Sequence, residues 1–406
     1  MIHNLIVIPL EINNQKLSFI LDSGVSKIIL FNISENDSIG LKNVKKVQLQ
    51  GLGKGESVAA LISENNKISI KNLESSAETI YVILRDDFDL SSKMGITIHG
   101  IIGYNILRNF IVKINYKSKK IVFYNLKNYT LKKCRKCEIF PIQFYRKKPY
   151  LNADVQLDTI ANETIHVKLL IDSGGSDALW LFEGAKKNIR TPIRSFPDIL
   201  GEGLSGLIYG NRSRIPKVTI GRFNVIKPTV SFLDSISSKN ARFFKKRHGS
   251  IGAGILNRFK VWFDYPNKQI MLRKNGSLSK EFNYNMSGLD IVYAGKQLVK
   301  EKETSILKNG YNQNVDANNS VNFITNFSYK FKPSFRIKSV LKESPADIAG
   351  LLKDDFVLKI NGKPSHEYTL NQILHQFQTK DKAKIKMTVE RNGKKIKFEF
   401  RLEKKI

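Results

Sequence analysis

The stretch FILDSGVSKIIL, residues 19 to 30, places a carboxylate, Asp22, at the end of an apolar, β-prone run and follows it with serine and glycine. A lone aspartate at a strand end is most often a turn residue, because an unpaired charge beside a core is costly. The chain supplies a second copy, LLIDSGGSDALWL at residues 169 to 181, with Asp172 in the same place. A turn function explains two such copies poorly, so we interpret the pair as a functional site.

Three further landmarks repeat in the same order as the two aspartates. GLGKG from residue 51 recurs as GEGLSG from residue 201, a shift of 150 like that of the aspartates. HGIIGYNILRNF from residue 99 recurs as HGSIGAGILNRF from residue 248, and INYKSKKIVFY from residue 114 resembles FDYPNKQIMLR from residue 263, both shifted by 149. Composition bias does not produce such regular spacing, so an internal duplication is predicted.

The duplication divides the first two thirds of the chain. We expect one lobe over residues 1–128, a basic linker over 129–147 and a second lobe over 148–274. Both lobes consist of short alternating apolar runs rich in Ile, Val, Phe and Tyr and interrupted by Gly, Asn and Asp, which is typical of strands. The predicted fold class is therefore mainly β.

Composition narrows the classes of function. The chain has 406 residues, 41% of them hydrophobic and 10% aromatic, enough for two or three globular domains. Its net charge of +31 comes from lysines spread along the chain, without a basic block interleaved with aromatics, so a nucleic-acid partner is not expected. A basic surface that associates with an anionic cell envelope stays open. No apolar run reaches 18 residues, so no membrane span is expected.

Two pairs of potentially reactive residues fit no catalytic or metal pattern. Cys134 and Cys137 form a CxxC, but no other cysteine completes a metal site, so an incidental loop pair, reduced or bridged, is expected. His99 and His248 hold matched positions before the second glycine motif. Neither has a nucleophile or further ligands in its sequence context, so both are interpreted as loop residues.

The duplicated motifs resemble those of aspartic proteases. ILDSGVS and LIDSGGS are similar to the active-site loop of that family, and IIGYNIL and SIGAGIL are similar to its second element, two apolar residues and a glycine before a short helix. The resemblance implies a bilobal, pepsin-like or retropepsin-like arrangement in which the two loops meet between the lobes. It assigns catalysis to Asp22 and Asp172, cross-bonding of the loops to Ser23 and Ser173, close backbone approach to Gly24 and Gly174, and the second motif to Gly103 and Gly252.

Paired carboxylates suit peptide hydrolysis without any metal or cofactor. Two such groups held about 3 Å apart share one proton, so one acts as general base on a water and the other as acid toward the scissile carbonyl. In pepsin-like enzymes a serine or threonine often follows the motif, whereas this chain has Val25 and Gly175. Losing a hydrogen bond to the charged form raises a carboxyl pKa, so an activity maximum at about pH 5 to 7 is expected.

The glycine-rich stretches between the two motifs of each lobe predict hairpin tips. By the same resemblance they would be flaps that close over the cleft; the alternative is ordinary tight hairpins. The flap candidates are Gly51, Gly53 and Gly55 in the first lobe and Gly201, Gly203 and Gly206 in the second.

Residues 282–406 follow another pattern, which resembles a bacterial PDZ domain. SPADIAGL at 344–351 is similar to its Ser-Pro-Ala helix, TLNQILHQF at 369–377 to the helix beside the peptide groove, and residues 383–402 to the closing hairpin. An Asn/Lys-rich insertion around 296–332 is expected to be a long mobile loop. The resemblance places carboxylate-binding backbone N–H groups at Met286, Gly288 and Leu289.

Taken whole, the chain resembles bacterial PDZ-bearing aspartyl proteases of the Bacteroidetes type. The resemblance implies an aspartic endopeptidase that acts on peptides or proteins, with the PDZ domain recruiting a ligand peptide. The alternative is a non-catalytic peptide-binding scaffold with an inactive protease-like core. We expect a monomer with an internal pseudo-two-fold axis. Since such proteins are usually exported, the periplasm or cell envelope is expected if a leader precedes this sequence, and the cytoplasm otherwise.

Overall fold

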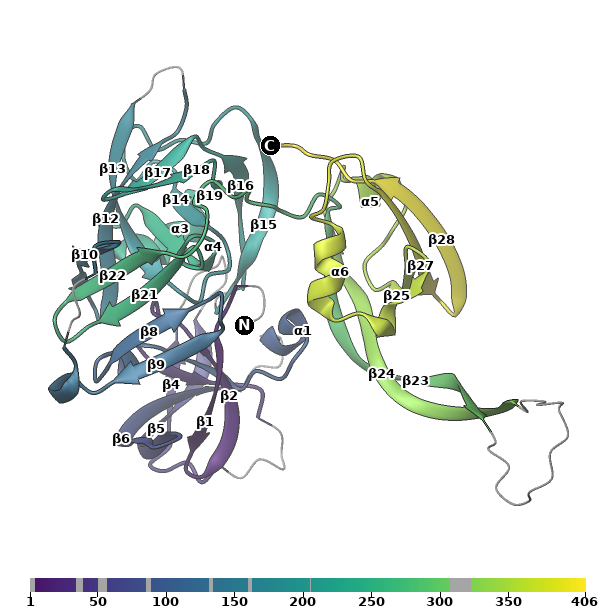
Figure 1. Cartoon of the computed structure of the whole chain (residues 1–406), viewed down its shortest axis with the longest axis horizontal. Helices are drawn as coiled ribbons and strands as arrows, with labels where there is room; N and C mark the ends of the chain where they lie inside the picture. The colour runs from purple at the N-terminus through teal and green to yellow at the C-terminus, as the bar shows by residue number, and fades with distance from the viewer. Residues whose placement is uncertain are drawn as a thin grey trace, which may run out of the picture. The chain divides into compact units, whose positions relative to one another are not determined.

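The computed structural model describes residues 4–33, 39–49, 57–84, 89–130, 134–159, 163–204, 206–306 and 323–406. These residues form two compact units, Met1–Met286 with Glu403–Ile406, and Ser287–Leu402. The chain is mainly β, as the sequence predicted, with only short helices (Figure 1). Among the described residues, no helix has the length and apolar character that crossing a membrane requires.

The first lobe is a seven-stranded sheet that closes on itself, because its first strand also pairs with β5. Burial alternates along the first hairpin, whose turn at Asn13 and Asn14 has φ values of 48° and 74°, the left-handed backbone that two-residue hairpin turns favour. The sheet order is β1 (Val7–Ile12), β2 (Gln15–Leu21), β7 (Gly100–Ile102), β3 (Ile28–Leu30), β6 (Leu73–Ile83), β5 (Val58–Ile70) and β4 (Lys45–Leu49). The helices of this lobe are α1 (Leu90–Met94) and α2 (Tyr104–Leu107).

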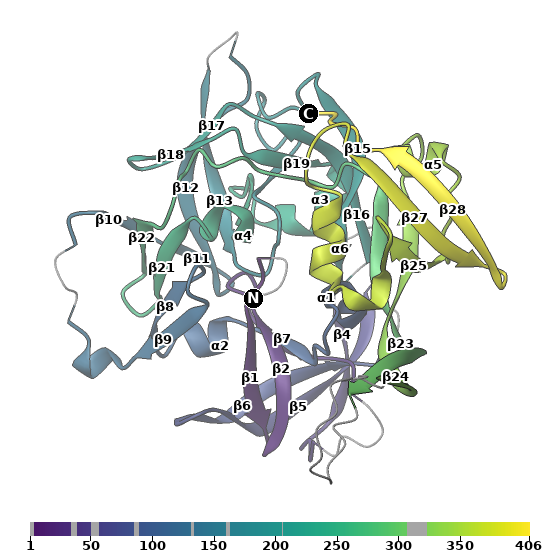
Figure 2. The same cartoon turned by 45° about the vertical axis from the view of Figure 1, so that its right-hand side comes forward.

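The second lobe repeats this arrangement in a sheet of ten strands (Figure 2). In each lobe the strand that leads to the aspartate pairs in parallel with the strand that leads to the short helix: β2 with β7, and β13 with β20. The sheet order is β15 (Ser195–Gly203), β16 (Gly206–Arg214), β19 (Thr229–Leu233), β14 (Leu179–Phe182), β20 (Gly249–Gly252), β13 (Thr164–Asp172), β12 (Lys148–Gln156), β17 (Lys217–Ile220) and β18 (Phe223–Ile226), with β11 (Gln143–Tyr145) on β12. The helices are α3 (Ser235–Ser238) and α4 (Ala253–Leu256).

A five-stranded sheet joins the two lobes. Its central pair is symmetric: Lys113 lies opposite Trp262, and the positions on either side pair reciprocally, as Ile111 with Asp264 and Asn115 with Lys260. Both lobes contribute to one continuous hydrophobic core. The sheet order is β10 (Cys137–Pro141), β22 (Gln269–Lys274), β21 (Phe259–Asp264), β8 (Ile111–Asn115) and β9 (Lys120–Tyr124). A disulfide between Cys134 and Cys137 stands at the start of β10.

The second unit is a five-stranded sheet with a short β26 (Lys363–Pro364) beside it and two helices. The sheet order is β23 (Leu289–Ile306), β24 (Phe323–Val340), β25 (Phe356–Ile360), β27 (Lys384–Arg391) and β28 (Lys394–Arg401). Ser344 caps α5 (Pro345–Ile348). Thr369 and Gln372 form a capping box at the start of α6 (Leu370–Gln376), which packs beside the edge strand β23.

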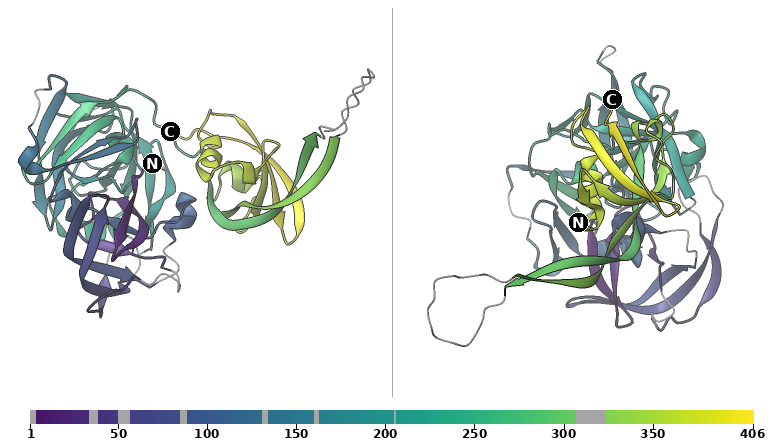
Figure 3. Two further views of the ribbon diagram at one scale, coloured as in Figure 1. Left: turned by 60° about the horizontal axis from the view of Figure 1, so that its bottom comes forward. Right: turned by 90° about the vertical axis from the view of Figure 1, so that its right-hand side faces the viewer.

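The segment 296–332, expected to be a loop, is largely a β-ribbon. β23 and β24 stay paired as far as Ile306 and Phe323, and the ribbon extends beyond the rest of its unit (Figure 3). Residues 307–322 lie outside the described part. The abundance of lysine and asparagine hid the period-two pattern of Phe327, Tyr329 and Phe331, which is a strand pattern.

Candidate active site

The two Asp-Ser-Gly loops meet at the junction of the lobes. Asp22 directly follows the buried end of β2, and its backbone N–H donates to Ile102 O of β7 at 2.8 Å. Asp172 is the last residue of β13. Both carboxyl side chains are half-buried, and the side chain of Asp22 is hydrogen-bonded to that of Asp172. Two residues 150 positions apart in the sequence are therefore in direct contact.

Four hydrogen bonds of Ser23 and Ser173 tie the loops together. The backbone N–H of Ser23 donates to Ser173 Oγ at 2.9 Å, and the N–H of Ser173 donates to Ser23 Oγ at 3.0 Å. Each hydroxyl then donates across the junction to a strand carbonyl, Ser23 Oγ to Ile171 at 2.7 Å and Ser173 Oγ to Leu21 at 2.9 Å. Both serines are buried, so each lobe supplies the partners that the opposite loop needs.

The glycine after each serine brings backbone against the carboxylates. Gly24 N–H donates to Asp22 Oδ1 at 2.7 Å, and Gly174 N–H donates to Asp172 Oδ1 at 3.1 Å. A Cβ atom at Gly174 would lie 2.2 Å from Asp22 Cγ. A side chain there would displace the carboxylate of the opposite lobe.

The glycines of the second motif support the loops from behind. A Cβ atom at Gly103 would lie 1.8 Å from the carbonyl oxygen of Asp22, and one at Gly252 would lie 2.3 Å from that of Asp177. These positions admit only glycine because the following helices, α2 and α4, begin directly against the active-site loops.

The surroundings of the pair favour a neutral form of Asp22. Burial, and next the charge of Asp172, raise the pKa of Asp22, while the N–H of Gly24 and the charge of Lys148 oppose the rise. Burial and the nearby Arg247 lower the pKa of Lys148. Arg247 is itself buried, and its guanidinium donates to Gly249 O at 3.2 Å and Ser250 Oγ at 2.7 Å. No sequence pattern marked Lys148 or Arg247 as part of the site.

Two equivalent tyrosines, also missed, lie close to the pair. Tyr116 and Tyr265 are 149 residues apart and both are buried. Tyr265 Oη donates to Ser23 O at 3.3 Å, whereas Tyr116 Oη has no hydrogen-bond partner among the described residues. Burial is the main cause that raises both phenol pKa values, and the charges of the aspartates add to it. The repeated INYKSK and FDYPNK landmarks carried the signal for them.

The second flap candidate is a hairpin that reaches the first lobe. β15 and β16 pair up to Gly203 and Gly206, and Gly206 has a φ of 95° at the tip. Glu202 forms an ion pair of 2.7 Å with Lys93 of α1, and Leu204 packs on an apolar cluster of the first lobe that includes Val25 of the active-site loop. Gly201 lies beside Trp180. Gly51, Gly53 and Gly55, which fall between β4 and β5 in the sequence, lie outside the described residues.

A polar network in the second lobe was not predicted either. Asp177 accepts from Trp180 Nε1 and Ser231 Oγ, both at 2.8 Å, and pairs with Arg212 at 3.3 Å. Arg212 also donates to Asp198 of β15 at 2.7 Å. The network links the active-site loop to the flap hairpin. Its members come from separate strands, so no local sequence pattern predicts the network.

The two histidines have matching structural contacts. His99 Nδ1 accepts from the backbone N–H of Ser18 at 3.1 Å, and His248 Nδ1 accepts from that of Lys168 at 2.8 Å. Both lie in the loop residues that precede β7 and β20. No group of three His, Cys, Asp or Glu that could hold a metal occurs within the described ranges.

The three predicted carboxylate-binding residues of the PDZ region fall at the boundary of the units. Met286 closes the first unit, and its carbonyl accepts from Glu403 N at 3.3 Å. Gly288 has a φ of 82°, and its carbonyl accepts from Leu341 N at 2.8 Å. Leu289 starts β23, and its N–H donates to Ser287 Oγ at 3.1 Å.

Two family models match parts of the chain. A family model described as aspartyl protease matches residues 8–106, a range that includes Asp22 and Gly103. A family model described as PDZ domain matches residues 336–391. The chain carries an aspartyl protease domain and a PDZ domain.

Other comparisons add little. No curated protein matches the chain. One similar solved structure is an HtrA-type protease, AlgWS227A with decapeptide, at 24% identity and a TM-score of 0.16. The match covers 17% of this chain, which spans only 21% of that protein, so the likeness bears on neither the fold nor the activity.

Proposed function

We propose that this protein is an aspartic endopeptidase in which Asp22 and Asp172 act as one catalytic pair. The observation that carries the proposal is their mutual hydrogen bond at the lobe junction, held by the reciprocal bonds of Ser23 and Ser173. Like-charged groups in contact cannot both ionise easily, so the pair holds one proton.

The environment favours placing the shared proton on Asp22, because burial and the charge of Asp172 raise its pKa. The carboxylate of Asp172 then takes a proton from a water molecule, whose oxygen attacks the scissile carbonyl carbon. Asp22 gives its proton to the carbonyl oxygen as the tetrahedral intermediate forms. In the second step Asp172 gives the proton that it took from the water to the amide nitrogen, and the C–N bond breaks. Asp22 takes back a proton from one hydroxyl of the intermediate as the new carboxyl group forms, so the pair regains its starting state.

The second flap supports an enclosed cleft. Its tip packs on the same apolar cluster as Val25 and is fastened by the Lys93–Glu202 ion pair, so it closes from one lobe to the other. Closing of this kind excludes water other than the nucleophile and orders an extended substrate. Opening requires the Lys93–Glu202 ion pair and the half-buried Leu204 to separate from the first lobe.

We propose that the PDZ domain recruits peptide segments by strand addition and takes no part in the chemistry. β23 is the edge strand of its sheet and α6 packs beside it, which is the arrangement that an added peptide strand requires. Gly288 and Leu289 stand at the start of this edge, where a peptide carboxylate would be received.

The ribbon of the second unit supports association with an anionic surface. Leu298, Phe327, Tyr329 and Phe331 are 57–71% exposed. The strand register places them on one face with Lys300 and Lys302. Exposed aromatics beside lysines suit the interface of an anionic membrane. Sedimentation with vesicles containing anionic lipid should lose most of the bound protein when Phe331 and Tyr329 are changed to serine. Equal binding of this variant would contradict the assignment.

Digestion of denatured casein tests the proposed reaction. Asp22→Asn and Asp172→Asn keep the shape but remove the shared proton, so each should lower turnover about 10³-fold or more, and the double variant should lose little beyond that. Asp154→Asn, on the exposed face of β12, is the matched control and should retain activity. Pepstatin should inhibit the wild type. Full activity in either pair variant would contradict the catalytic pair, and absence of cleavage by the wild type would favour the scaffold alternative.

A further inference from the structure

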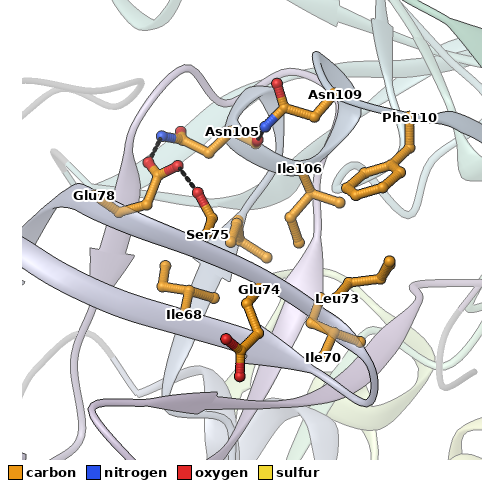
Figure 4. Close-up of a pocket in the computed structure, with 11 residues that line it drawn as sticks. Ile68, Ile70, Leu73, Glu74, Ser75, Glu78, Asn105, Ile106, Asn109 and Phe110 are labelled. Atoms are coloured by element: carbon orange, nitrogen blue, oxygen red, sulfur yellow. Dashed lines mark hydrogen bonds between the residues drawn. The ribbon is translucent and has the colours of Figure 1, made fainter. Parts of the chain in front are cut away.

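A pocket in the first lobe belongs to no part of the proposed site. It opens to solvent, and about 620 Å³ of space outside the protein atoms lies within it and its open mouth. One wall is the β5–β6 hairpin and the other is formed by the end of β7, α2 and the residues after it (Figure 4). The apolar lining consists of Ile68, Ile70, Leu73, Ile102, Ile106 and Phe110.

The pocket has one polar end. Glu78 is buried and accepts from Ser75 Oγ at 2.6 Å, Asn105 Nδ2 at 2.5 Å and Arg108 Nη2 at 3.1 Å. The carbonyl oxygen Oδ1 of Asn105 is buried and has no partner among the described residues. A buried acceptor without a donor is costly, so this end of the pocket is suited to a ligand that brings an N–H group.

The second lobe shows what covers the equivalent surface. The duplication relates the pocket to positions in the second lobe. A shift of 150 takes Ile70 to Ile220 and Leu73 to Phe223, and a shift of 149 takes Phe110 to Phe259. The three residues of the first lobe are partly exposed, whereas their counterparts are buried. The same surface is therefore open in one lobe and covered in the other.

The cover is the chain's own segment after β22. Leu278 and Phe282 join the core, and Ile226 N of β18 donates to Leu278 O at 3.2 Å. Arg258 donates to the carbonyl oxygens of Leu278 at 3.3 Å and Lys280 at 2.7 Å, and its guanidinium lies 3.4 Å from the ring centre of Phe282. An extended segment with two apolar side chains four residues apart thus fills this place.

The first lobe has no such cover of its own in the described residues. The counterpart of Leu278 is Tyr129, which follows β9. Tyr129 packs instead on Tyr124, with ring centres 4.8 Å apart, against the cluster of Ile111, Trp262 and Met271 on the inter-lobe sheet. The chain after β9 is therefore drawn to another surface, and the pocket stays open.

We propose that this pocket is a docking site for an extended segment of a partner polypeptide that presents two large apolar side chains four residues apart. The apolar wall takes the two side chains, as the second lobe takes Leu278 and Phe282, and Asn105 Oδ1 accepts an N–H of the segment. Asn109, the counterpart of Arg258, stands at the rim. The site is independent of the aspartate pair and does not rest on the proposed reaction.

A peptide of the chain's own covering segment, NGSLSKEFNY (residues 275–284), serves as the probe. Labelled with fluorescein, it should bind the full chain saturably with a micromolar Kd by fluorescence polarisation. The peptide with both apolar residues changed to serine should not compete. Leu73→Arg should weaken binding about tenfold or more, and Val122→Arg, an exposed apolar position on β9 away from the pocket, should change it less than about twofold.

A variant that binds more tightly serves as a second test, because misfolding would weaken binding and not strengthen it. Asn109→Arg restores the cation that the second lobe uses, so it should tighten binding about tenfold. Three results would overturn the proposal. The first is no saturable binding to the wild type, and the second is binding unaffected by Leu73→Arg, which indicates that the peptide replaces the chain's own segment at the second lobe. The third is binding of a fatty acid such as laurate at this pocket that the peptide does not displace.

Discussion

Removing the hydroxyl of Ser173 should lower the free energy of unfolding, and the hydrogen bonds lost at the junction of the lobes set the size of the effect. Ser173 Oγ accepts from Ser23 N–H and donates to Leu21 O, so Ser173→Ala leaves a buried backbone donor and a buried acceptor without these partners. Each unsatisfied group costs about 1–3 kcal/mol, and the acceptor tends to the low end because a carbonyl has two lone pairs. The expected loss is about 2–4 kcal/mol, a large share of a typical domain stability.

Urea unfolding followed by tryptophan fluorescence measures this loss. The sequence contains two tryptophans, and both, Trp180 and Trp262, lie in the first unit, so the signal does not report the PDZ domain. With an m-value of about 3 kcal/mol/M, the midpoint should fall by about 1 M. Ser176→Ala, exposed in the same loop, is the control and should stay within about 0.5 kcal/mol of the wild type.

A conservative substitution tests whether the hydroxyl of Ser173, and not its side-chain volume, accounts for the loss of stability. Ser173→Thr keeps the hydroxyl and should retain most of the stability that alanine loses. If Ser173→Ala costs no more than Ser176→Ala, the cross-lobe bonds do not hold the junction, and the argument from buried unsatisfied groups fails.

Three further outcomes follow from the site. The kcat/KM profile should decline as pH rises through about 8, where Asp22 loses its proton. Lys148→Met should move this decline to higher pH, because the lysine charge lowers the pKa of Asp22. A flat profile from pH 4 to 9 would contradict both expectations. Glu202→Gln should raise KM for long peptides more than it lowers kcat, because it removes the ion pair with Lys93 that fastens the flap, and Lys93→Met should match it. Gly103→Ala should prevent folding of the first unit, visible by circular dichroism, since its Cβ would overlap Asp22 O; a folded, active variant would refute this close approach.

The duplication made much of the fold predictable, because strands and turns recur at a nearly constant shift. The mainly β class followed from alternation in both halves. The contact of Asp22 with Asp172 was expected from the resemblance, and their catalytic role stays a prediction. Features without a counterpart in the other half were missed: Arg247 stands where the first lobe has Ile98, and Asp177 where it has Lys27. Their contacts come from remote strands, which sequence spacing does not reveal.

The reciprocal pairing of β8 with β21 makes the two halves of the protease domain obligate partners. Two copies of the first half that met along β8 would bring Lys113 against Lys113, and like charges directly opposite repel. In the actual pair the ammonium of Lys113 lies 5.0 Å from the ring centre of Trp262, an attractive arrangement. Halves produced as separate polypeptides should therefore assemble as a heterodimer in preference to a homodimer of the first half.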